Sequence, residues 1–264
     1  MKSLGIIGAG NMGRAIGLGV KKKNPQREIS FFDIDREKAR EAAAQCEAQS
    51  RDTLSALFEN SEILLIAVKP QQLDELFAQL PRSAADKGYI SIAAGVPIER
   101  FRQALGTDRV VRFMPNLAAT VGASVVAVAS REAADSGLKE ESWQIASAIG
   151  QPIDLPERLL SAFTGLSGSG LAYVFAFIHA LALGGTDAGI AYQDSLEIAL
   201  GTVDGAVKLL QRQASHPQEA LSRVCSAGGT TIRGVKELER GAFAYTVMEA
   251  VRAAADRADE LERG

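Results

Sequence analysis

Residues 5–13 read GIIGAGNMG, and this stretch decides the fold of the first part of the chain. Gly8, Gly10 and Gly13 form the pattern G-x-G-x-x-G, between an apolar run typical of a buried strand and a segment with helical spacing. In this context the first glycine allows a tight turn, the second lets the backbone approach a pyrophosphate, and the third lets helix and strand pack closely. The stretch therefore predicts a dinucleotide-binding turn, with Asn11 and Met12 at the start of its helix.

Short apolar runs alternate with helix-like segments from residue 1 to about residue 156. This alternation is typical of a parallel sheet wrapped by helices. The sequence therefore predicts an α/β fold in which residues 1–156 form a Rossmann-like dinucleotide-binding domain. The apolar runs are LGIIGA, EISFFD, EILLIAV, YISIAAG, RVVRFM and SVVAVA.

The strand-like runs stop after residue 156, and the apolar residues then follow helical spacing with Gly and Pro punctuation. We therefore expect an all-helical domain over residues 157–264, joined by the short segment QPIDLPERLL. The apolar run at 171–183 predicts a buried helix at a subunit interface. It is too short to span a bilayer, which takes roughly 20 residues, so no membrane partner is expected.

The composition limits which classes of partner and which cellular compartment we expect for this protein. Hydrophobic residues make up 47% of the 264 residues, and the formal net charge of −3 argues against a nucleic-acid partner. Cys46, Cys225, His179 and His216 show no metal-ligand spacing, so no metal site is expected. The opening residues do not resemble a secretory signal, and we expect a cytoplasmic protein with reduced thiols.

Asp33 follows the second apolar run, where an acid accepts hydrogen bonds from the adenosine ribose. A carboxylate there repels a 2′-phosphate, which favours NADH over NADPH. Arg36 complicates this prediction because an arginine can accommodate that phosphate. Alternatively, Asp33 is a turn residue that also caps the next helix.

The segment AVKPQ, residues 67–71, follows another apolar run. It should leave the carboxyl edge of the sheet, where open α/β folds bind ligands. Ala67, Val68, Lys69 and Pro70 are therefore candidate cofactor-binding residues. Lys69 has an equally good alternative interpretation as a solvated loop charge.

A second small-residue loop lies in VCSAGGTTIRGVKELE, residues 224–239, with helical sequence on both sides. Gly228, Gly229, Thr230 and Thr231 follow one another there. Small residues before a helix expose several N–H donors, and the helix N-terminus adds partial positive charge, so an anion can bind. The other interpretation is an ordinary helix start capped by a threonine hydroxyl, which can coexist with anion binding.

Several segments together resemble the pyrroline-5-carboxylate reductase family, in order and over nearly the whole chain. The resemblance implies a reductase that passes hydride from NAD(P)H to the C=N of 1-pyrroline-5-carboxylate and forms L-proline. It also implies a homodimer with interlocked helical domains, sometimes assembled into a decamer. The segments are GAGNMGRAI, AVKPQ, SIAAGV, RFMPN, TGLSGSGLAYVF and SAGGTTIRGVKELE.

The resemblance also implies roles for particular residues. The loop at 226–231 binds the substrate, and its N–H groups hold the substrate carboxylate with help from Ser226. Thr231 lies near the ring nitrogen and is the catalytic candidate. The remaining residues of the implied site are Gly228, Gly229, Thr230 and Asn116 toward the substrate, and Ala93, Ala94, Gly95, Met114 and Pro115 toward the nicotinamide.

The sequence departs from the family pattern at several positions. Leu171 and Ala227 replace prolines, His179 replaces an acidic residue, and MPNLA at 114–118 replaces MPNTP. These changes leave open a paralogue that reduces a related cyclic imine such as a piperideine carboxylate, or a non-catalytic NADH-binding paralogue.

The β-hydroxyacid dehydrogenases are a further alternative, because they also pair a dinucleotide domain with a helical domain. They resemble one another in a catalytic lysine on a helix of the second domain. Lys208 and Lys236 are the lysines beyond residue 150, and neither lies in a K-x-x-N context. The sequence therefore argues against this group.

Overall fold

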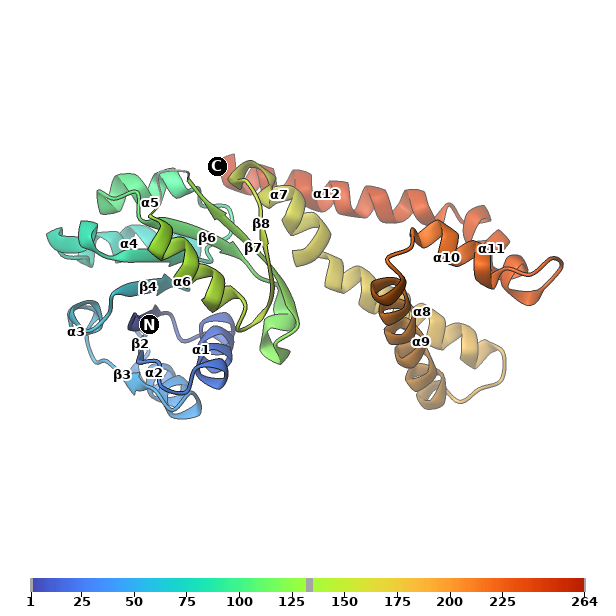
Figure 1. Cartoon of the computed structure of the whole chain (residues 1–264), viewed down its shortest axis with the longest axis horizontal. Coiled ribbons are helices and arrows are strands. Elements are labelled where there is room, and N and C mark those ends of the chain that lie inside the picture. The colour runs from blue at the N-terminus through green and yellow to red at the C-terminus, as the bar shows by residue number, and fades with distance from the viewer. Residues whose placement is uncertain (1, 132–134, 264) are drawn as a thin grey trace. The chain divides into compact units, whose positions relative to one another are not determined.

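The structure is a computed structural model that describes residues 2–131 and 135–263 (Figure 1). Contacts within the chain divide it into two compact units. The sheet unit comprises Met1–Gly168 and Ala253–Gly264, and the helical unit comprises Ser169–Arg252. The domain boundary at residue 156 stays a prediction, because these units reflect packing inside a single chain.

Among the described residues, the sheet unit contains one eight-stranded sheet with the order β3-β2-β1-β4-β5-β6-β7-β8. The strands from β1 to β6 are parallel, as the alternating sequence predicts, but β7 runs antiparallel to β6. β1 lies between β2 and β4, so the strand order reverses there, and ligands bind at such a point in doubly wound folds. The strands are β1 (Leu4–Ile7), β2 (Ile29–Phe32), β3 (Gln49–Ser50), β4 (Ile63–Ile66), β5 (Gly88–Ser91), β6 (Val110–Met114), β7 (Ser124–Ser130) and β8 (Gly150–Asp154).

The central strands are apolar on both faces because helices cover both sides of the sheet (Figure 1). In β4, Ile63 and Leu65 join one buried cluster, whereas Leu64 and Ile66 join another. Successive side chains of a strand point to opposite faces, so each cluster is the core of one face. The continuous apolar runs of the sequence thus arise from burial on both sides.

The helices of the sheet unit follow the strands along the chain. Strands β3 and β8 lie outside the apolar runs that the sequence predicts as strands. The segment expected as the interdomain join, QPIDLPERLL, contains most of strand β8. The helices are α1 (Asn11–Lys23), α2 (Arg36–Gln45), α3 (Leu54–Glu59), α4 (Leu73–Gln79), α5 (Ile98–Leu105), α6 (Ser136–Ala146) and α7 (Leu160–Phe163).

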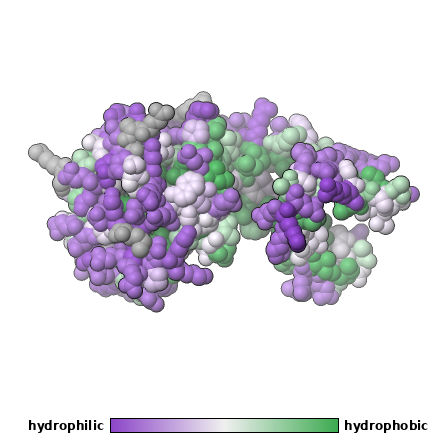
Figure 2. Space-filling view, in the orientation of Figure 1, coloured by the Kyte–Doolittle hydropathy of each residue, from purple (hydrophilic) through white to green (hydrophobic). Residues whose placement is uncertain are grey.

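The helical unit has almost no core of its own. Its helices are α8 (Gly170–Asp187), α9 (Tyr192–Gln213), α10 (Pro217–Val224), α11 (Thr230–Arg240) and the first part of α12 (Phe243–Arg263). Of its residues, all of which the structure describes, Ala182, Ser195 and Ala199 are buried. Figure 2 shows apolar side chains on the surface over α8 and α9. The helix predicted at 171–183 is thus largely exposed in the single chain, and its burial at a subunit interface stays a prediction.

The length prediction for this run also needs correction. The apolar run is part of one helical stretch, Glu157–Asp187, of 31 residues. By length and composition alone this stretch is long and apolar enough to cross a membrane. The helix length judged from the apolar run alone was too short, because the helix begins well before residue 171. The absence of a membrane partner stays a prediction.

Candidate functional site

The predicted cofactor residues follow the carboxyl ends of four parallel strands. Gly8 follows β1, Ala67 follows β4, Ala93 follows β5 and Pro115 follows β6. Parallel strands end at the same edge of a sheet, so these loops meet along one edge. A cavity of about 410 Å³ opens there, at the point where the strand order reverses. Its lining includes Gly8, Gly10, Asp33, Ala67, Val68 and Lys69.

The three glycines of the turn have different steric surroundings. Gly8 has φ +101°, and a Cβ there would lie 2.6 Å from the Ala67 carbonyl oxygen. A Cβ on Gly13 would lie 2.1 Å from the Gly8 carbonyl oxygen. A Cβ on Gly10 would meet no atom within 4 Å. Gly8 and Gly13 are therefore required by packing, whereas Gly10 leaves open space at the helix start.

The start of α1 presents backbone donors to this space. Gly10 is the N-cap, and no side chain of the described residues caps it. Asn11 is exposed at the first helical position, while Met12 packs partly against the core. Uncapped N–H groups at a helix N-terminus attract anions. The site therefore fits a pyrophosphate-bearing dinucleotide.

Asp33 contacts the glycine turn directly. Its carboxylate accepts hydrogen bonds from the Ala9 N–H, at 2.7 Å, and from the Asp35 N–H, at 3.0 Å. The alternative in which Asp33 caps the next helix is wrong, because Asp35 is the N-cap of α2 and accepts from the Glu37 and Lys38 N–H groups. Asp33 thus fixes the turn and still lines the cavity.

Two residues that the sequence reasoning missed line the cavity beside Asp33. Ile34 is 70% exposed, and an exposed isoleucine beside a nucleotide cavity suits the flat apolar face of a base. Lys38 also lines the cavity and pairs with Asp35 at 3.1 Å. Arg36 is exposed. A basic residue within six positions of Asp33 could have indicated Lys38 from the sequence, but the sequence analysis named only Arg36.

Lys69 and Pro70 form the start of a short turn after β4. The Lys69 N–H donates to the Gln72 side-chain oxygen at 3.1 Å, and the Lys69 side chain is exposed and lines the cavity. Both interpretations of Lys69, ligand contact and solvated charge, remain compatible with this geometry.

Asn116 is buried and fully engaged by protein groups. Its side-chain amide donates to the Ser167 hydroxyl at 3.1 Å and accepts from the Ala118 N–H at 3.1 Å. Ser167 belongs to the SGSG motif, so Asn116 ties the segment after β6 to that motif. Substrate contact by Asn116 stays a prediction, and the geometry assigns it a local structural role.

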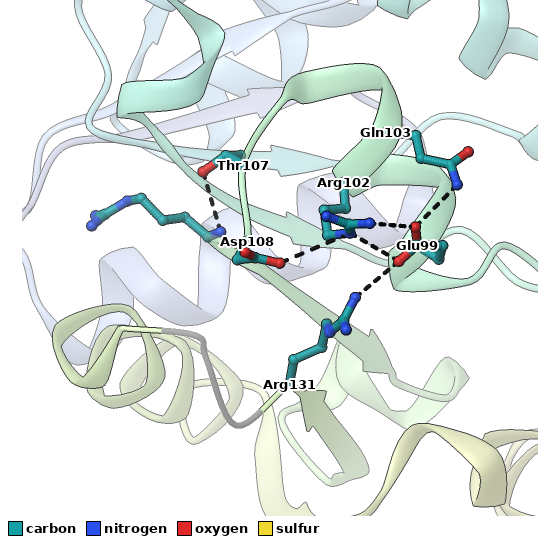
Figure 3. A network of polar contacts seen from close by, with 7 residues as sticks. Glu99, Arg102, Gln103, Thr107, Asp108 and Arg131 are labelled. Atoms are coloured by element: carbon teal, nitrogen blue, oxygen red, sulfur yellow. Dashed lines mark hydrogen bonds and ion pairs between the residues drawn. The ribbon is translucent and has the colours of Figure 1, made fainter.

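A polar network lies at the start of α5, beyond the loop that contains Ala93–Gly95 (Figure 3). Glu99 accepts from Arg102, Gln103 and Arg131. The hydrogen bond from Arg102 is the largest cause that lowers the pKa of Glu99 to about 2. These side chains are exposed, and exposed ion pairs contribute little to stability. The network is therefore a surface feature of α5, and none of the predicted site residues takes part in it.

The second small-residue loop, Ser226–Thr231, lies in the helical unit and is largely exposed. Gly228 has φ +70°, and a Cβ on Gly229 would lie 2.2 Å from the Ser226 hydroxyl. Gly229 is the N-cap of α11, and among the described residues no side chain caps it. The alternative of a threonine hydroxyl cap is therefore wrong. The Thr230 and Thr231 N–H groups begin the helix without a side-chain partner and suit an anion.

His179 lies on α8 and contacts α9. Its Nδ1 atom lies 3.0 Å from the Tyr192 hydroxyl. The imidazole is exposed in the single chain. This contact joins two helices and gives His179 a packing partner inside the helical unit.

Titratable groups elsewhere offer no metal centre within the described residues. No group of three or more His, Cys, Asp or Glu side chains is arranged to hold a metal ion in that part of the chain. Cys46 is buried, and burial raises the pKa of its thiol to about 11.

Comparison with known proteins identifies both parts of the chain. Residues 157–261 match the family model for pyrroline-5-carboxylate reductase dimerisation, and residues 3–95 match the model for NADP oxidoreductase, coenzyme F420-dependent. The pyrroline-5-carboxylate reductase of Aquifex aeolicus is 39% identical over 260 residues, which cover 98% of this chain and 97% of the relative.

Solved structures agree with this match. The pyrroline-5-carboxylate reductase of Coxiella burnetii is 27% identical, with a TM-score of 0.91 over 98% of each chain. The pyrroline carboxylate reductase of Plasmodium falciparum, solved with NADP bound, is 26% identical, with a TM-score of 0.87 over 99% of this chain and 98% of that one. With the full-length identity to the Aquifex protein, these matches show that the chain belongs to the pyrroline-5-carboxylate reductase family.

Proposed function

We propose that this protein reduces the C=N bond of 1-pyrroline-5-carboxylate with hydride from NAD(P)H and forms L-proline. The observation that carries the proposal is the 39% identity to a pyrroline-5-carboxylate reductase over nearly the whole of both chains. Two local features support it. The cavity of about 410 Å³ lies beside the glycine turn and Asp33, and the loop at 226–231 offers uncapped N–H donors for a carboxylate.

The loop at 226–231 would hold the substrate carboxylate. The N–H groups of Gly228 and Thr230, together with the Ser226 hydroxyl, would donate to it without an arginine, whereas the Gly229 N–H already donates to the Ser226 carbonyl oxygen at 3.1 Å. The Thr231 hydroxyl would then lie near the ring nitrogen. Its task is orientation, because a protonated imine is already electrophilic and needs little further activation.

The sheet unit would bind the cofactor, which supplies the hydride when bound. The start of α1 would hold the pyrophosphate, and Asp33 would accept hydrogen bonds from the ribose hydroxyls. Ala93–Gly95 with Met114 and Pro115 would line the nicotinamide. The Asp33 carboxylate favours NADH, whereas Lys38, which lines the cavity, and Arg36, which follows Asp33 in the sequence, would favour a 2′-phosphate.

The helical unit would complete its core with a second copy of the chain. An apolar cavity of about 870 Å³ is lined by α8 residues and by α11 and α12 residues, among them Phe177, Leu181 and Phe243. The match to a dimerisation model over residues 157–261 supports a homodimer, which we propose is interlocked and can form a decamer. A second copy that covers these residues would also explain the exposed apolar helical stretch without insertion into a bilayer. We therefore propose that the enzyme is cytoplasmic.

The first test is the initial rate of NADH and NADPH oxidation with pyrroline-5-carboxylate, beside six-membered piperideine carboxylates. Faster turnover of the five-membered ring, with proline as product, is expected. Turnover of the larger ring alone would contradict the proposed substrate and assign Leu171, His179 and Ala227 to a reshaped pocket. Cofactor binding without turnover of either imine would favour a non-catalytic protein.

Thr231→Ala tests the substrate loop. Losing a hydrogen bond to a charged group costs roughly 1.5–3 kcal/mol, so kcat/KM for the imine should fall roughly 10- to 100-fold. The dissociation constant of NADH should change less than about twofold, since the cofactor cavity lies in the sheet unit. Thr231→Ser keeps the hydroxyl and should retain most activity. An equal loss of NADH affinity would make the loop structural.

A further inference from the structure

Arg112 is a buried charge inside an apolar strand. It lies on β6 between Val111 and Phe113, both buried in the sheet core. The Arg112 side chain is 2% exposed. A buried guanidinium is strongly destabilising without charged partners, so its partners indicate what the charge is for.

The partners come from distant parts of the chain. The Arg112 Nη1 atom donates to the Glu157 carboxylate at 2.7 Å and to the Glu262 carboxylate at 2.7 Å. Glu157 begins the helical segment after β8, and Glu262 lies in the last turn of α12. Ser161 also donates to Glu262, at 3.3 Å. One guanidinium therefore holds together a strand, a helix start and a helix end, all within the sheet unit.

The same cluster reaches the loop between β5 and α5. The Glu157 carboxylate accepts from the Ile98 N–H at 2.6 Å. Pro97, the N-cap of α5, makes no side-chain cap among the described residues, so Glu157 caps this helix from outside. The loop of residues 92–97 is thus fixed at its far end by the Arg112 cluster.

The last turn of α12 also lies directly against this loop. Gly95 has φ +69°, and a Cβ there would lie 3.1 Å from the Leu261 carbonyl oxygen. A small cavity of about 80 Å³ beside the contact is lined by Ala94, Gly95, Met114 and Leu261, among others. These loop residues are the ones predicted to line the nicotinamide.

We propose that Arg112 and Glu262 are positioning residues for hydride transfer. Their ion pair holds the last turn of α12 against Gly95 and so fixes the loop at 92–97 beneath the nicotinamide. The inference rests on the proposed function, because it requires the nicotinamide to lie beside Gly95 and Met114. Neither charged group touches the reacting atoms. Both act through the shape of the loop.

The test compares Glu262→Ala with Glu262→Gln in the full-length protein. The alanine variant loses the tether, so kcat should fall about tenfold, because misplacing reactants by an ångström slows transfer strongly. The KM for NADH should change less than about twofold, because the pyrophosphate and ribose contacts stay intact. The glutamine variant keeps an oxygen acceptor for Arg112 and should retain at least about half of kcat.

Glu260→Ala is the matched control. Glu260 lies on the same turn of α12 and pairs with Arg257 at 2.6 Å, with both side chains mostly exposed. This variant removes a carboxylate from the same turn without touching the cluster, so kcat should stay unchanged. An equal loss of kcat in the control, or no loss in Glu262→Ala, would overturn the proposal.

Hydrogen exchange supplies a readout that does not depend on turnover. Glu262→Ala should speed amide exchange of residues 92–98, while residues 8–13 keep their protection. Inactive wild-type protein would refute the proposed function alone. Unchanged exchange at 92–98 in Glu262→Ala would refute the tether alone.

Discussion

The sheet unit and the helical unit satisfy their apolar residues in opposite ways. In the sheet unit, the strands bury apolar side chains on both faces, in two clusters that the helices of the same chain cover. In the helical unit, large side chains such as Phe175, Leu183, Tyr245 and Met248 are exposed, and the buried residues are small. Free energy of burial scales with apolar area removed from water. The sheet unit can therefore be stable as a single chain, whereas the helical unit requires association.

The largest expected effect comes from a charge in the apolar surface of the helical unit. Leu181→Arg places an unpaired cation in the cavity that the second copy would fill, and such burial costs several kcal/mol in each subunit. The dimer should dissociate and activity should fall at least about 100-fold, while NADH still binds. Light scattering and NADH titration check this.

Leu18→Arg is the matched control for that substitution. Leu18 and Leu181 are both 40% exposed, but Leu18 lies on α1 of the sheet unit. The Leu18 variant should stay dimeric. If both variants dissociated, or if neither did, the proposed difference between the sheet unit and the helical unit would be contradicted.

Two of the three glycines of the turn are expected to affect different properties of the sheet unit: Gly13 its stability and Gly10 its cofactor binding. Gly13→Ala places a Cβ 2.1 Å from a carbonyl oxygen, and such overpacking costs about 1–3 kcal/mol of stability. Gly10→Ala meets no atom within 4 Å, so Tm should be unchanged. Its methyl group would occupy the space proposed for the pyrophosphate, so NADH should bind about tenfold more weakly. Calorimetry measures the Tm of both variants, and titration measures their affinity for NADH. If the two variants changed Tm and NADH affinity equally, the assignment of Gly13 to folding and Gly10 to cofactor binding would be refuted.

Asp33→Asn tests cofactor choice with little effect on folding. The asparagine keeps an oxygen that accepts from the Ala9 N–H, but it removes the charge that repels a 2′-phosphate. The ratio of kcat/KM for NADPH to that for NADH should rise about tenfold, which steady-state kinetics measures. An unchanged ratio would remove Asp33 from the ribose site.

A pH dependence confined to the sheet unit has no effect at neutral pH and appears only in alkaline solution. Burial raises the pKa of Cys46 to about 11, above the ordinary value of 9.0. The unfolded chain therefore ionises first, so this stabilisation is complete below pH 9 and is lost as the pH rises to about 11. Cys46→Ala should reduce the alkaline loss of unfolding free energy by about 2–3 kcal/mol, at 1.36 kcal/mol per pKa unit. Denaturant titrations from pH 8 to 11 check this, and Cys225→Ala should leave the loss unchanged.

The sequence by itself determined the local elements and the dinucleotide turn. The glycine spacing at 8–13 identified the dinucleotide turn because only glycine fits the steric demands found at Gly8 and Gly13. The apolar runs located the parallel strands, because burial on both faces leaves a local pattern. The helix start after the loop at 226–231 was identifiable for the same reason, since chain geometry at a helix start is a local property, whereas substrate binding by this loop stays a prediction.

Only the tertiary structure decided the features that depend on distant contacts. The antiparallel direction of β7, the engagement of Asn116 by Ser167 and the cap of α5 by Glu157 join segments that no local pattern relates. Arg112 was visible in RFMPN, yet its partner Glu262 lies 150 residues away. The exposure of α8 was equally hidden, because an apolar helix has the same sequence pattern whether its own chain or a second chain covers it.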